Sequence, residues 1–420
     1  MKRALVALFL IAPFLALAAS PARAETKARP PAKALAAKKR PIAPSAASRT
    51  PVKREGEAEA RLIEIYKLVG QASTREALRR AEGLVRDHPN FQLAQLLYGD
   101  LLASRTRPVN TLGDVPDTKA AAPQLAELRQ ESLLRLRALR ERPAPGTVPS
   151  QFLALSPTSK HAIAIDASRA RLYLFENTTA GLKLLADYYI SVGKLGTEKF
   201  VEGDQRTPLG VYFITSNLNP KSLRDFYGSG ALPINYPNQL DVKRGKTGSG
   251  IWLHGTPADQ FSRAPLASDG CVVLANPDLQ RLIKTVEIRN TPVVIAKSLQ
   301  WVAPHALKAD IKSFEDMLQG WHRTKSSGDM AKLKAWYAPD FTSYGKTMAE
   351  WTPALQAEVK QLGGRDIQLK DVSYLRWTDS SDTMVVTFGE LVKGANSGRT
   401  KRQYWIRQGS QWKIFFEGTI

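Results

Sequence analysis

Two short segments decide the fold of the middle of this chain: Ile251-Trp252-Leu253-His254-Gly255-Thr256 and Ser268-Asp269-Gly270-Cys271-Val272-Val273-Leu274. Each contains a run of large apolar residues next to glycine and small polar residues, which is typical of a buried strand. The first strand ends in a histidine, and the second begins at the only cysteine of the 420 residues. Since His254 and Cys271 are 17 positions apart, one loop can fold back and bring imidazole and thiol together. The two segments therefore predict a β-rich domain built around a histidine–cysteine pair.

A cysteine beside a histidine is suited to nucleophilic catalysis. A free thiol has a pKa of about 8.5 and is mostly protonated at neutral pH, and a nearby imidazole produces the reactive thiolate. We therefore expect Cys271 to react with iodoacetamide at a lower pH than an isolated thiol, and removal of His254 to reverse that shift. Gly270 lets the backbone approach closely or take a positive φ. The amides of Gly270 and Cys271 are then candidates to stabilise a tetrahedral oxyanion.

The rest of residues 150–300 has the same strand signature. Apolar and polar residues alternate, and Gly, Pro, Asn or Asp separates the runs. One segment, 277–285, has the period of a helix instead. The expected strands are 161–166 and 171–176, which form a hairpin, followed by 184–192, 210–215, 250–254 and 292–296.

Three short segments of residues 150–300, taken together, resemble the catalytic domain of the L,D-transpeptidase (YkuD) family. They are the turn and strand at 203–215, the His-Gly end of the first quoted segment and the Ser-x-Gly-Cys element of the second, and the resemblance spans residues 155–297. It implies that Cys271 is the acyl-accepting nucleophile and that His254 is its general base. It also implies that the backbone carbonyl of Gly255 orients the imidazole.

The sequence departs from the family pattern at two positions. Asp269 stands where the family often has histidine, and we expect its carboxylate to orient His254 or a substrate amine. Val273 stands where arginine is common, which removes the usual group for the carboxylate of the donor. The candidates to replace that arginine are Arg263, Arg244 and Arg206.

The resemblance also places the substrate side of the site. Residues 230–241, with Leu-Pro-Ile-Asn-Tyr-Pro at their centre, are similar to the substrate-side loop of the family. On this basis we assign Tyr236 in that loop, together with Trp252 and Arg263, to substrate binding.

The middle domain is flanked by two other folds. Residues 55–142 have apolar residues at helical spacing, and we expect a helical module used for docking or as the interface of a homodimer. Residues 304–420 begin with two helices and continue as alternating strands, which predicts an α+β cone that resembles the nuclear-transport-factor-2-like (NTF2-like) fold. The expected chain is thus multidomain: an N-terminal α-helical module, a β-rich YkuD-like catalytic domain at 150–300 and the C-terminal cone. This domain order resembles the cell-shape L,D-carboxypeptidases of helical Gram-negative bacteria, which trim tetrapeptide stems to tripeptides.

The C-terminal cone is expected to bind rather than to catalyse. It is rich in Trp and Tyr, and no pair of catalytic residues stands out in it. Its His322 is expected on a helix surface or lining a pocket. A protein that ends near Ala303 should therefore still act on soluble muropeptides and lose binding to the sacculus.

The N-terminus has the pattern of an export signal. Lys2 and Arg3 precede the apolar run 4–19, and Ala22-Arg23-Ala24 fits a cleavage site, so residues 1–24 are predicted to be a signal peptide. An uncleaved membrane anchor is the alternative. Residues 25–54 are rich in Ala, Pro, Lys and Arg, and predict a solvated tether that suits an anionic surface such as peptidoglycan or lipid headgroups. We expect a periplasmic protein associated with the cell wall.

Composition and charge exclude several classes of protein. With 43% hydrophobic and 24% charged residues, the chain is not collagen-like, coiled coil or wholly disordered. A single cysteine rules out an internal disulfide, cysteine-based zinc fingers and iron–sulfur clusters. The net charge of +21 would suit nucleic acid, but export and the lack of interleaved aromatic residues in the tether argue against that partner.

Three interpretations of function stay open. In the first, an exported cysteine enzyme cleaves the bond between meso-diaminopimelate and D-Ala of a peptidoglycan stem through a Cys271 thioester. Water as acceptor makes it an L,D-carboxypeptidase, a stem amine an L,D-transpeptidase, and a lysine of a lipoprotein or other protein an anchoring enzyme. In the second, the site has decayed and the chain is a cell-wall binding or scaffold protein. The third makes His254, Asp259 and Cys271 metal ligands, but their spacing matches no standard zinc motif, so neither metal nor cofactor is predicted.

Overall fold

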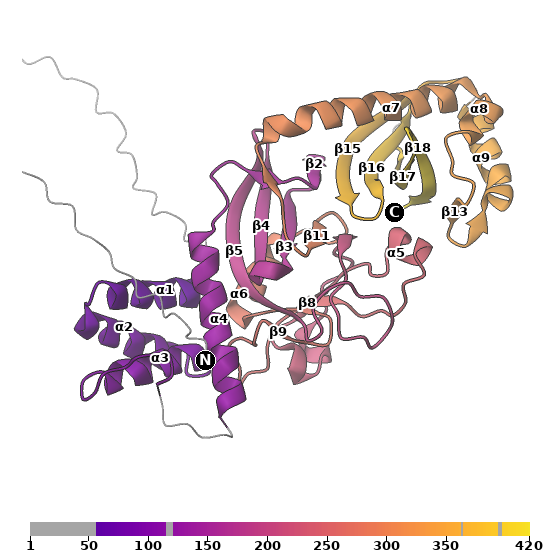
Figure 1. The fold of residues 1–420 in the computed structure, drawn as a ribbon. Coiled ribbons are helices and arrows are strands. Elements are labelled where there is room, and N and C mark those ends of the chain that lie inside the picture. Colours follow the sequence, from indigo (N-terminus) through magenta and orange to yellow (C-terminus); the bar gives the residue numbers. More distant parts are fainter. Residues whose placement is uncertain (1–55, 115–120, 363, 394–396) are drawn as a thin grey trace, which may run out of the picture. The chain divides into compact units, whose positions relative to one another are not determined.

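The computed structural model describes residues 56–114, 121–362, 364–393 and 397–420 (Figure 1). The predicted signal peptide and basic tether lie outside the described residues. Within the described ranges, no helix combines the length and the apolar character needed to cross a membrane.

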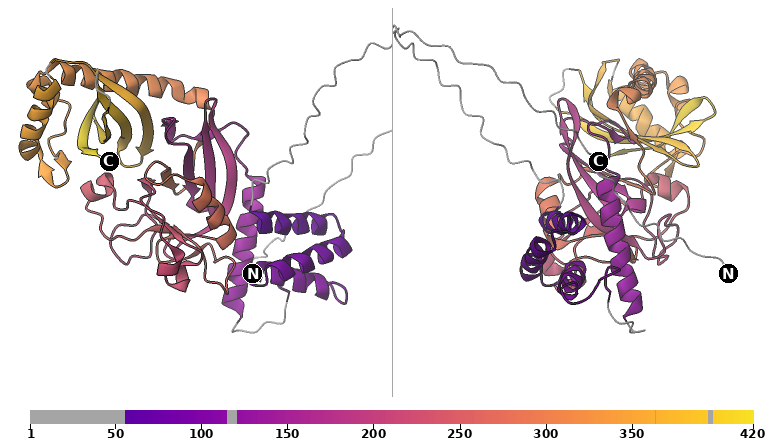
Figure 2. Two further views of the ribbon diagram at one scale, coloured as in Figure 1. Left: turned by 180° about the vertical axis from the view of Figure 1, so that it is seen from behind. Right: turned by 60° about the vertical axis from the view of Figure 1, so that its left-hand side comes forward.

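The first part of the described chain is helical, as expected. Leu62 and Ile65 of the first helix and Ala77, Ala81 and Leu84 of the second are fully buried or nearly so, and pack into one hydrophobic cluster. Figures 1 and 2 show the first three helices side by side next to the longer fourth. The helices are α1 (Glu57–Gly70), α2 (Thr74–Asp87), α3 (Gln92–Ala103) and α4 (Ala122–Arg140).

The middle of the chain forms a mixed sheet in the order β6-β11-β3-β4-β5-β10-β8-β7, with β9 beside β5. The predicted hairpin is present as β3 and β4, which pair antiparallel from His161 with Glu176 to Asp166 with Arg171. The strands are β3 (His161–Asp166), β4 (Arg171–Thr178), β5 (Gly181–Gly193), β6 (Gly210–Phe213), β7 (Ala231–Pro233), β8 (Trp252–His254), β9 (Leu266–Ser268), β10 (Val272–Leu274) and β11 (Pro292–Ala296), and the helices are α5 (Gln239–Lys243) and α6 (Asn276–Thr285).

The C-terminal part is an antiparallel sheet covered by a long helix. Phe314, Leu318 and Trp321 of α7 (Lys308–Ser327) pack on the sheet, and Figures 1 and 2 show α7 lying across it. The sequence predicted this helix and the next, but not α9 (Met348–Leu362), which accommodates Pro353 in its second turn. The remaining elements are α8 (Met330–Lys334), β13 (Thr342–Ser343), β14 (Lys346–Thr347), β15 (Ile367–Thr378), β16 (Asp382–Val392), β17 (Arg399–Gln408) and β18 (Gln411–Thr419).

The catalytic and C-terminal parts share structure across the predicted boundaries at 150 and 304. Strand β2 (Phe152–Ala154) precedes the catalytic sheet in sequence but pairs with β15. Short strands β1 (Val148–Pro149) and β12 (Trp301–Val302) also pair with each other. One hydrophobic cluster joins Phe175 and Phe213 of the catalytic sheet to Trp377 and Tyr404 of the C-terminal sheet. A protein that ends near Ala303 would expose this cluster to water, so point variants test the C-terminal part more cleanly than truncation.

A buried ionic cluster joins the helical module to the catalytic sheet. Glu59 of α1 lies 2.9 Å from Arg135 of α4 and 2.8 Å from Arg171 of β4. Arg135 also pairs with Glu131 at 2.6 Å, and Arg171 pairs with Asp187. Burial raises the pKa of Glu59, but the two arginines outweigh burial and the pKa lies below its ordinary value. Removing one member would leave a buried charge without its partner, which is strongly destabilising.

Asp278, in the first turn of α6, is expected to lower stability above neutral pH. Burial and the nearby charge of Glu59 raise the pKa of Asp278 to about 7, from the ordinary value of 3.8 for a free side chain. Between these two values the folded state holds a proton that the unfolded state has lost, so stability falls as pH rises through this window. Asp278→Asn removes the effect and should stabilise the protein near pH 8 by up to about 4 kcal/mol, at roughly 1.4 kcal/mol per pKa unit.

Urea unfolding of wild type and Asp278→Asn near pH 4 and near pH 8 measures this difference. The gain should vanish at the lower pH, and the exposed control Asp259→Asn should show no gain at either. A variant that is less stable than wild type near pH 8 would mean that Asp278 is ionised and paired.

Candidate active site

His254 and Cys271 lie at two neighbouring strands that run parallel. Strand β8 ends at His254 and β10 begins one residue after Cys271, and the ladder pairs Leu253 with Val272. Leu253 and Val272 both belong to the hydrophobic core of the sheet. Successive side chains along a strand point to opposite faces of the sheet. His254 and Cys271 are therefore directed to the face opposite to the one that carries Leu253 and Val272. The register of the two strands thus places the predicted pair on one side of the catalytic sheet.

The imidazole of His254 is fixed in one orientation. The residue is 1% exposed, and its Nδ1 lies 2.7 Å from the carbonyl oxygen of Gly255. A carbonyl only accepts, so Nδ1 carries the proton and Nε2 keeps its lone pair. Burial is the main reason that the pKa of His254 falls to about 4, and the charge of Arg263 acts in the same direction. At neutral pH His254 is therefore an uncharged base whose Nε2 is able to accept a proton.

The Cys271 thiol is held against strand β8. The backbone N–H of Trp252 donates to Sγ over 3.4 Å, and the thiol donates to the carbonyl of Gly250 over 3.4 Å. Desolvation of the sulfur raises the pKa of Cys271 to about 11, although the Trp252 amide opposes that rise. The lowered thiol pKa expected from the sequence is therefore wrong, because burial disfavours the thiolate and the neutral imidazole supplies no compensating charge. The resting pair is a thiol and a neutral imidazole.

Asp269 does not orient His254. Its carboxylate is exposed and lies 3.0 Å from Lys194 Nζ and 3.3 Å from Gln205 Nε2. The partner of His254 is the Gly255 carbonyl instead. The predicted role toward His254 is thus wrong, because Asp269 lies on a turn that directs its side chain to solvent. Its role toward a substrate amine stays a prediction. Its negative charge does act on Cys271, whose pKa it raises.

Gly270 shapes the turn before the cysteine rather than offering an amide to substrate. Its φ is +123°, and a Cβ at this position would lie 2.8 Å from the carbonyl oxygen of Arg206. Its N–H donates to Ser268 Oγ at 3.1 Å, and its carbonyl accepts from Thr207 Oγ1 at 2.9 Å. The predicted oxyanion role therefore does not hold for the Gly270 amide, and it stays a prediction for the amide of Cys271.

Of the three candidate arginines, Arg263 lies at the site. Its guanidinium carbon lies 4.3 Å from the centre of the Phe226 ring, and its charge lowers the pKa of both His254 and Cys271. The other two are engaged elsewhere: Arg206 donates to the carbonyl of Thr197, and Arg244 binds Asp379 and Ser381 of the C-terminal part.

The two aromatic residues assigned to substrate binding lie in different environments. Trp252 is half-buried and packs on Tyr227, with ring centres 4.7 Å apart. Tyr236 is 5% exposed, belongs to the core cluster and donates its hydroxyl to the carbonyl of Thr247. The predicted contact of Tyr236 with substrate is corrected, because the loop that carries it turns this side chain inward.

Sequence reasoning missed two features around the histidine. Phe226 and Tyr227, on a short 3-10 helix, place their rings 5.8 Å and 5.1 Å from the His254 ring and form an aromatic wall. Asn276 fixes the turn after His254, since its Oδ1 accepts from the amides of Ser229 and Thr256. Only the second feature had a signal in the sequence: Asn276 is followed by a proline just after a predicted strand, and this pattern marks the start of a helix.

The described ranges contain no group of three or more His, Cys, Asp or Glu side chains placed to hold a metal ion. No such cluster therefore supports the alternative in which His254, Asp259 and Cys271 bind a metal ion.

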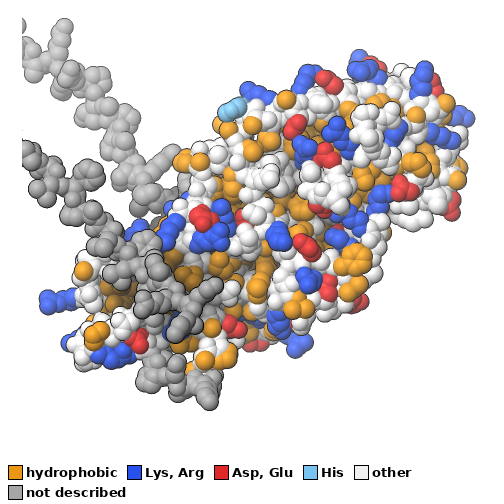
Figure 3. All heavy atoms as spheres, in the orientation of Figure 1, with side chains coloured by type: hydrophobic (Ala, Val, Ile, Leu, Met, Phe, Trp, Pro, Cys, Tyr) orange, Lys and Arg blue, Asp and Glu red, His pale blue; other side chains and the backbone are white. Residues whose placement is uncertain are grey.

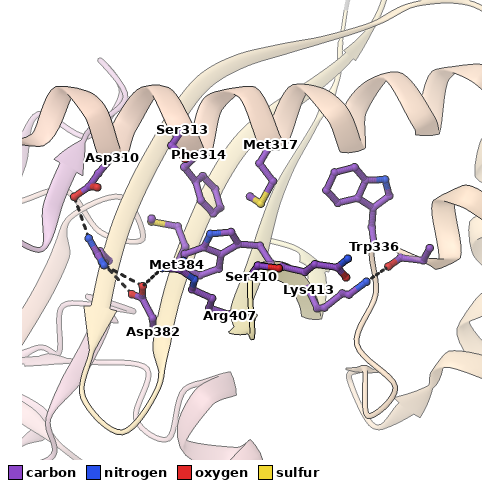
Figure 4. A pocket seen from close by; sticks show the side chains of 14 residues that line it. Asp310, Ser313, Phe314, Met317, Trp336, Asp382, Met384, Arg407, Ser410 and Lys413 are labelled. Carbon is purple, nitrogen blue, oxygen red and sulfur yellow. Dashed lines mark hydrogen bonds and ion pairs between the residues drawn. The ribbon is translucent and has the colours of Figure 1, made fainter.

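The C-terminal part contains a separate pocket of about 530 Å³ between α7 and the end of the sheet (Figure 4). Phe314 and Trp412 form part of its wall, with ring centres 5.3 Å apart. At one end Arg376 binds Asp310 and Asp382, each at 3.0 Å. His322 does not line this pocket, and its Nε2 lies 2.6 Å from the carbonyl of Ile367.

Comparison with known families identifies two segments. Residues 160–295 match the L,D-transpeptidase catalytic domain (YkuD), and residues 313–418 match the Cds6 C-terminal NTF2-like domain. No curated protein sequence matches the chain closely enough to count as a relative.

Two solved structures have a similar fold. Bd1075 from Bdellovibrio bacteriovorus matches with a TM-score of 0.55 and 24% identity, over 65% of this chain and 98% of Bd1075. Pgp2 from Campylobacter jejuni, described as a helical cell shape determining protein, matches with a TM-score of 0.50 and 20% identity, over 69% of this chain and 99% of Pgp2. With its histidine–cysteine pair at β8 and β10, the middle of this chain is a YkuD-type L,D-transpeptidase catalytic domain, and an NTF2-like domain of the Cds6 C-terminal type follows it.

Proposed function

We propose that this protein is an exported cysteine enzyme that acts on peptidoglycan stem peptides through a thioester on Cys271. The observation that carries the proposal is the state of His254. Its Nδ1 is tied to the Gly255 carbonyl, which leaves Nε2 as a neutral base on the same face of the sheet as the only thiol. We do not expect a site that has lost its activity to retain an oriented neutral imidazole on the same face of the sheet as the thiol.

The chemistry follows from the two pKa values. Because the pKa of Cys271 is about 11 and that of His254 about 4, a stable ion pair is unfavourable, and the thiol proton moves to Nε2 as sulfur attacks. Attack on the carbonyl between meso-diaminopimelate and D-Ala forms the C–S bond and a tetrahedral oxyanion. When this collapses, the C–N bond breaks and the imidazolium gives its proton to the departing D-Ala amine. A thioester and neutral His254 remain.

The second half of the reaction decides the product. The acceptor loses a proton to Nε2 and attacks the thioester, and the departing sulfur takes that proton back. Water gives a carboxypeptidase, a stem amine a transpeptidase, and a protein lysine an anchoring enzyme. Arg263, beside Cys271 and His254, binds a carboxylate of the stem in place of the arginine that Val273 replaces.

Export and cell-wall association belong to the same proposal. The pattern of residues 1–24 supports secretion, and the basic segment 25–54 suits an anionic wall polymer. On the face seen in Figure 3, Lys and Arg are spread among Asp and Glu rather than gathered in one patch. A role in cell shape, as described for Pgp2, fits this chemistry.

Incubation of the mature protein with purified disaccharide-tetrapeptides, followed by mass analysis, tests the proposal. Loss of one D-Ala without dimers indicates a carboxypeptidase, and dimers indicate a transpeptidase. If neither product forms while the protein still binds sacculi, the binding-protein interpretation replaces the enzyme.

The NTF2-like pocket supports a second role, in binding the wall. We expect Trp412→Ala to lower binding to sacculi at least about tenfold, since a buried aromatic anchor contributes that much to recognition. Activity on soluble muropeptides should change less than about twofold, because the pocket lies outside the catalytic sheet. Co-sedimentation with sacculi and muropeptide turnover measure the two effects. Tyr344→Ala, an exposed aromatic outside the pocket, is the control, and equal sacculus binding by all three proteins would refute the pocket's role.

A further inference from the structure

The loop between β8 and β9, residues 255–265, is held by the helical module. The N–H of Phe261 donates to the backbone carbonyl of Asn90 at 3.1 Å, and Asn90 Nδ2 donates to the carbonyl of Ala258 at 3.0 Å. The Phe261 ring stacks on Phe91 with centres 4.2 Å apart and meets the edge of His88 at 5.3 Å. Phe261 and Phe91 are both buried, so the α2–α3 junction forms a socket for this loop.

A second anchor follows immediately in the sequence. Ser262 Oγ donates to Glu131 of α4 at 2.8 Å, and Glu131 is fixed by its ion pair with Arg135. The Tyr189 hydroxyl donates to the carbonyl of Arg263 at 2.9 Å, and the Arg135 guanidinium covers the Tyr189 ring at 3.9 Å. The Ser262 side chain and the Arg263 backbone carbonyl are therefore tied to buried groups of α4 and β5.

The same loop contributes to the active site through one side chain. Phe261 and Ser262 contact the module, whereas the Arg263 guanidinium packs on Phe226 and its charge acts on His254 and Cys271. A loop without regular structure of its own samples many conformations, and external contacts are needed to hold one side chain in place. The helical module supplies those contacts.

We propose that the helical module, through its helices α1 to α4, is a positioning element of the active site: by holding Phe261 and Ser262 it sets Arg263 beside Cys271 to receive a substrate carboxylate. The module lies outside both family matches, which begin at residue 160 and residue 313. The proposal rests on the proposed thioester chemistry of Cys271. The faces of the module that carry Phe91 and Glu131 are covered within the chain, so a homodimer would use other surfaces.

The test uses the unique thiol as a reporter of the Arg263 charge. Anionic iodoacetate and neutral iodoacetamide alkylate the same Cys271 thiolate, so the ratio of their rates cancels the thiolate fraction. A positive charge held near sulfur raises this ratio about three- to fivefold. Phe261→Ala and Ser262→Ala loosen the loop and should lower the ratio towards the value of Arg263→Gln. Phe261→Leu, which keeps an apolar side chain in the socket, should restore most of it.

A second readout uses the muropeptide reaction. Loosening the loop should raise KM several-fold with little change in kcat, because carboxylate binding is lost and the base and nucleophile are untouched. In the Arg263→Gln background, Phe261→Ala should raise KM hardly any further, since both changes act through the same guanidinium. Leu133→Ala, on the exposed side of α4, is the matched control and should behave as wild type.

The outcomes separate this proposal from the proposed function. The positioning role is overturned if Phe261→Ala and Ser262→Ala are folded and leave both the alkylation ratio and KM unchanged. It is also overturned if Phe261→Ala raises KM by the same factor in the Arg263→Gln variant as in the wild type. If the alkylation ratio falls as expected but wild type turns over no muropeptide, the positioning role stands and the proposed function fails.

Discussion

Replacement of Cys271 by alanine is expected to abolish turnover of muropeptides, with a loss of at least about ten-thousand-fold, because no thioester can form. The side chain is small and half-buried, and within the described part of the chain its hydrogen bonds are to the Trp252 amide and the Gly250 carbonyl, so the fold should persist. Mass analysis of muropeptide products and a thermal melt of the variant measure the two effects.

Binding to sacculi is the internal control for this variant, because the NTF2-like pocket is untouched by the change. An inactive variant that still melts and binds as wild type assigns the loss to chemistry. A variant that retains wild-type turnover would end the cysteine mechanism, whatever the family match implies.

Replacement of His254 by glutamine is expected to lower kcat/KM about a thousandfold or more, because no base then accepts the thiol proton. The structure changes what the pH dependence should look like. With the pKa of His254 at about 4, activity of the wild type should rise as pH passes that value and the imidazole loses its proton. It should then stay flat across neutrality, because the thiol, with a pKa of about 11, remains protonated throughout.

The alkylation profile of Cys271 gives the complementary test. Because a neutral imidazole adds no charge, iodoacetamide should react with wild type and His254→Gln along nearly the same curve, which rises towards a midpoint of about 11. This reverses the expectation drawn from the sequence, in which removal of His254 raised the thiol pKa. A wild-type midpoint below that of a free thiol, lost in the variant, would show a resting thiolate–imidazolium pair and refute the neutral one.

Local pattern was enough to predict several strands and to locate the candidate His254–Cys271 pair. The hairpin at β3 and β4 and the strand β11 occur where alternation and turn residues placed them, because these preferences act over a few neighbouring residues. The same is true of the order His254, glycine turn, Cys271, since a histidine at a strand end and a Gly-Cys turn are visible one after the other.

Other features depend on residues far away in the chain. Tyr236 looks like a loop residue in the sequence, and it becomes a core residue because Tyr212 and the carbonyl of Thr247 close around it. Asp269 lies two positions before Cys271 in the sequence, but the turn directs its carboxylate to Lys194 rather than to His254. Strand β2 pairs with β15, which lies more than 200 positions later in the chain, and no local pattern predicts that pairing.

By itself, the sequence determined the succession of helical, β-rich and α+β segments, because the periodicity of apolar residues depends only on near neighbours. It also singled out Cys271 and His254 as the candidate nucleophile and base, through their spacing and their resemblance to the family motif. Only the tertiary structure decided how those groups are poised. It buried the imidazole and removed much of the thiol from solvent, which sets the directions of their pKa shifts. It also placed Arg263, of the three candidate arginines, next to the aromatic wall at His254, on a loop that contacts Glu131 and Asn90. Desolvation and side-chain placement depend on what the rest of the chain packs against each group, and that is decided only when distant elements meet.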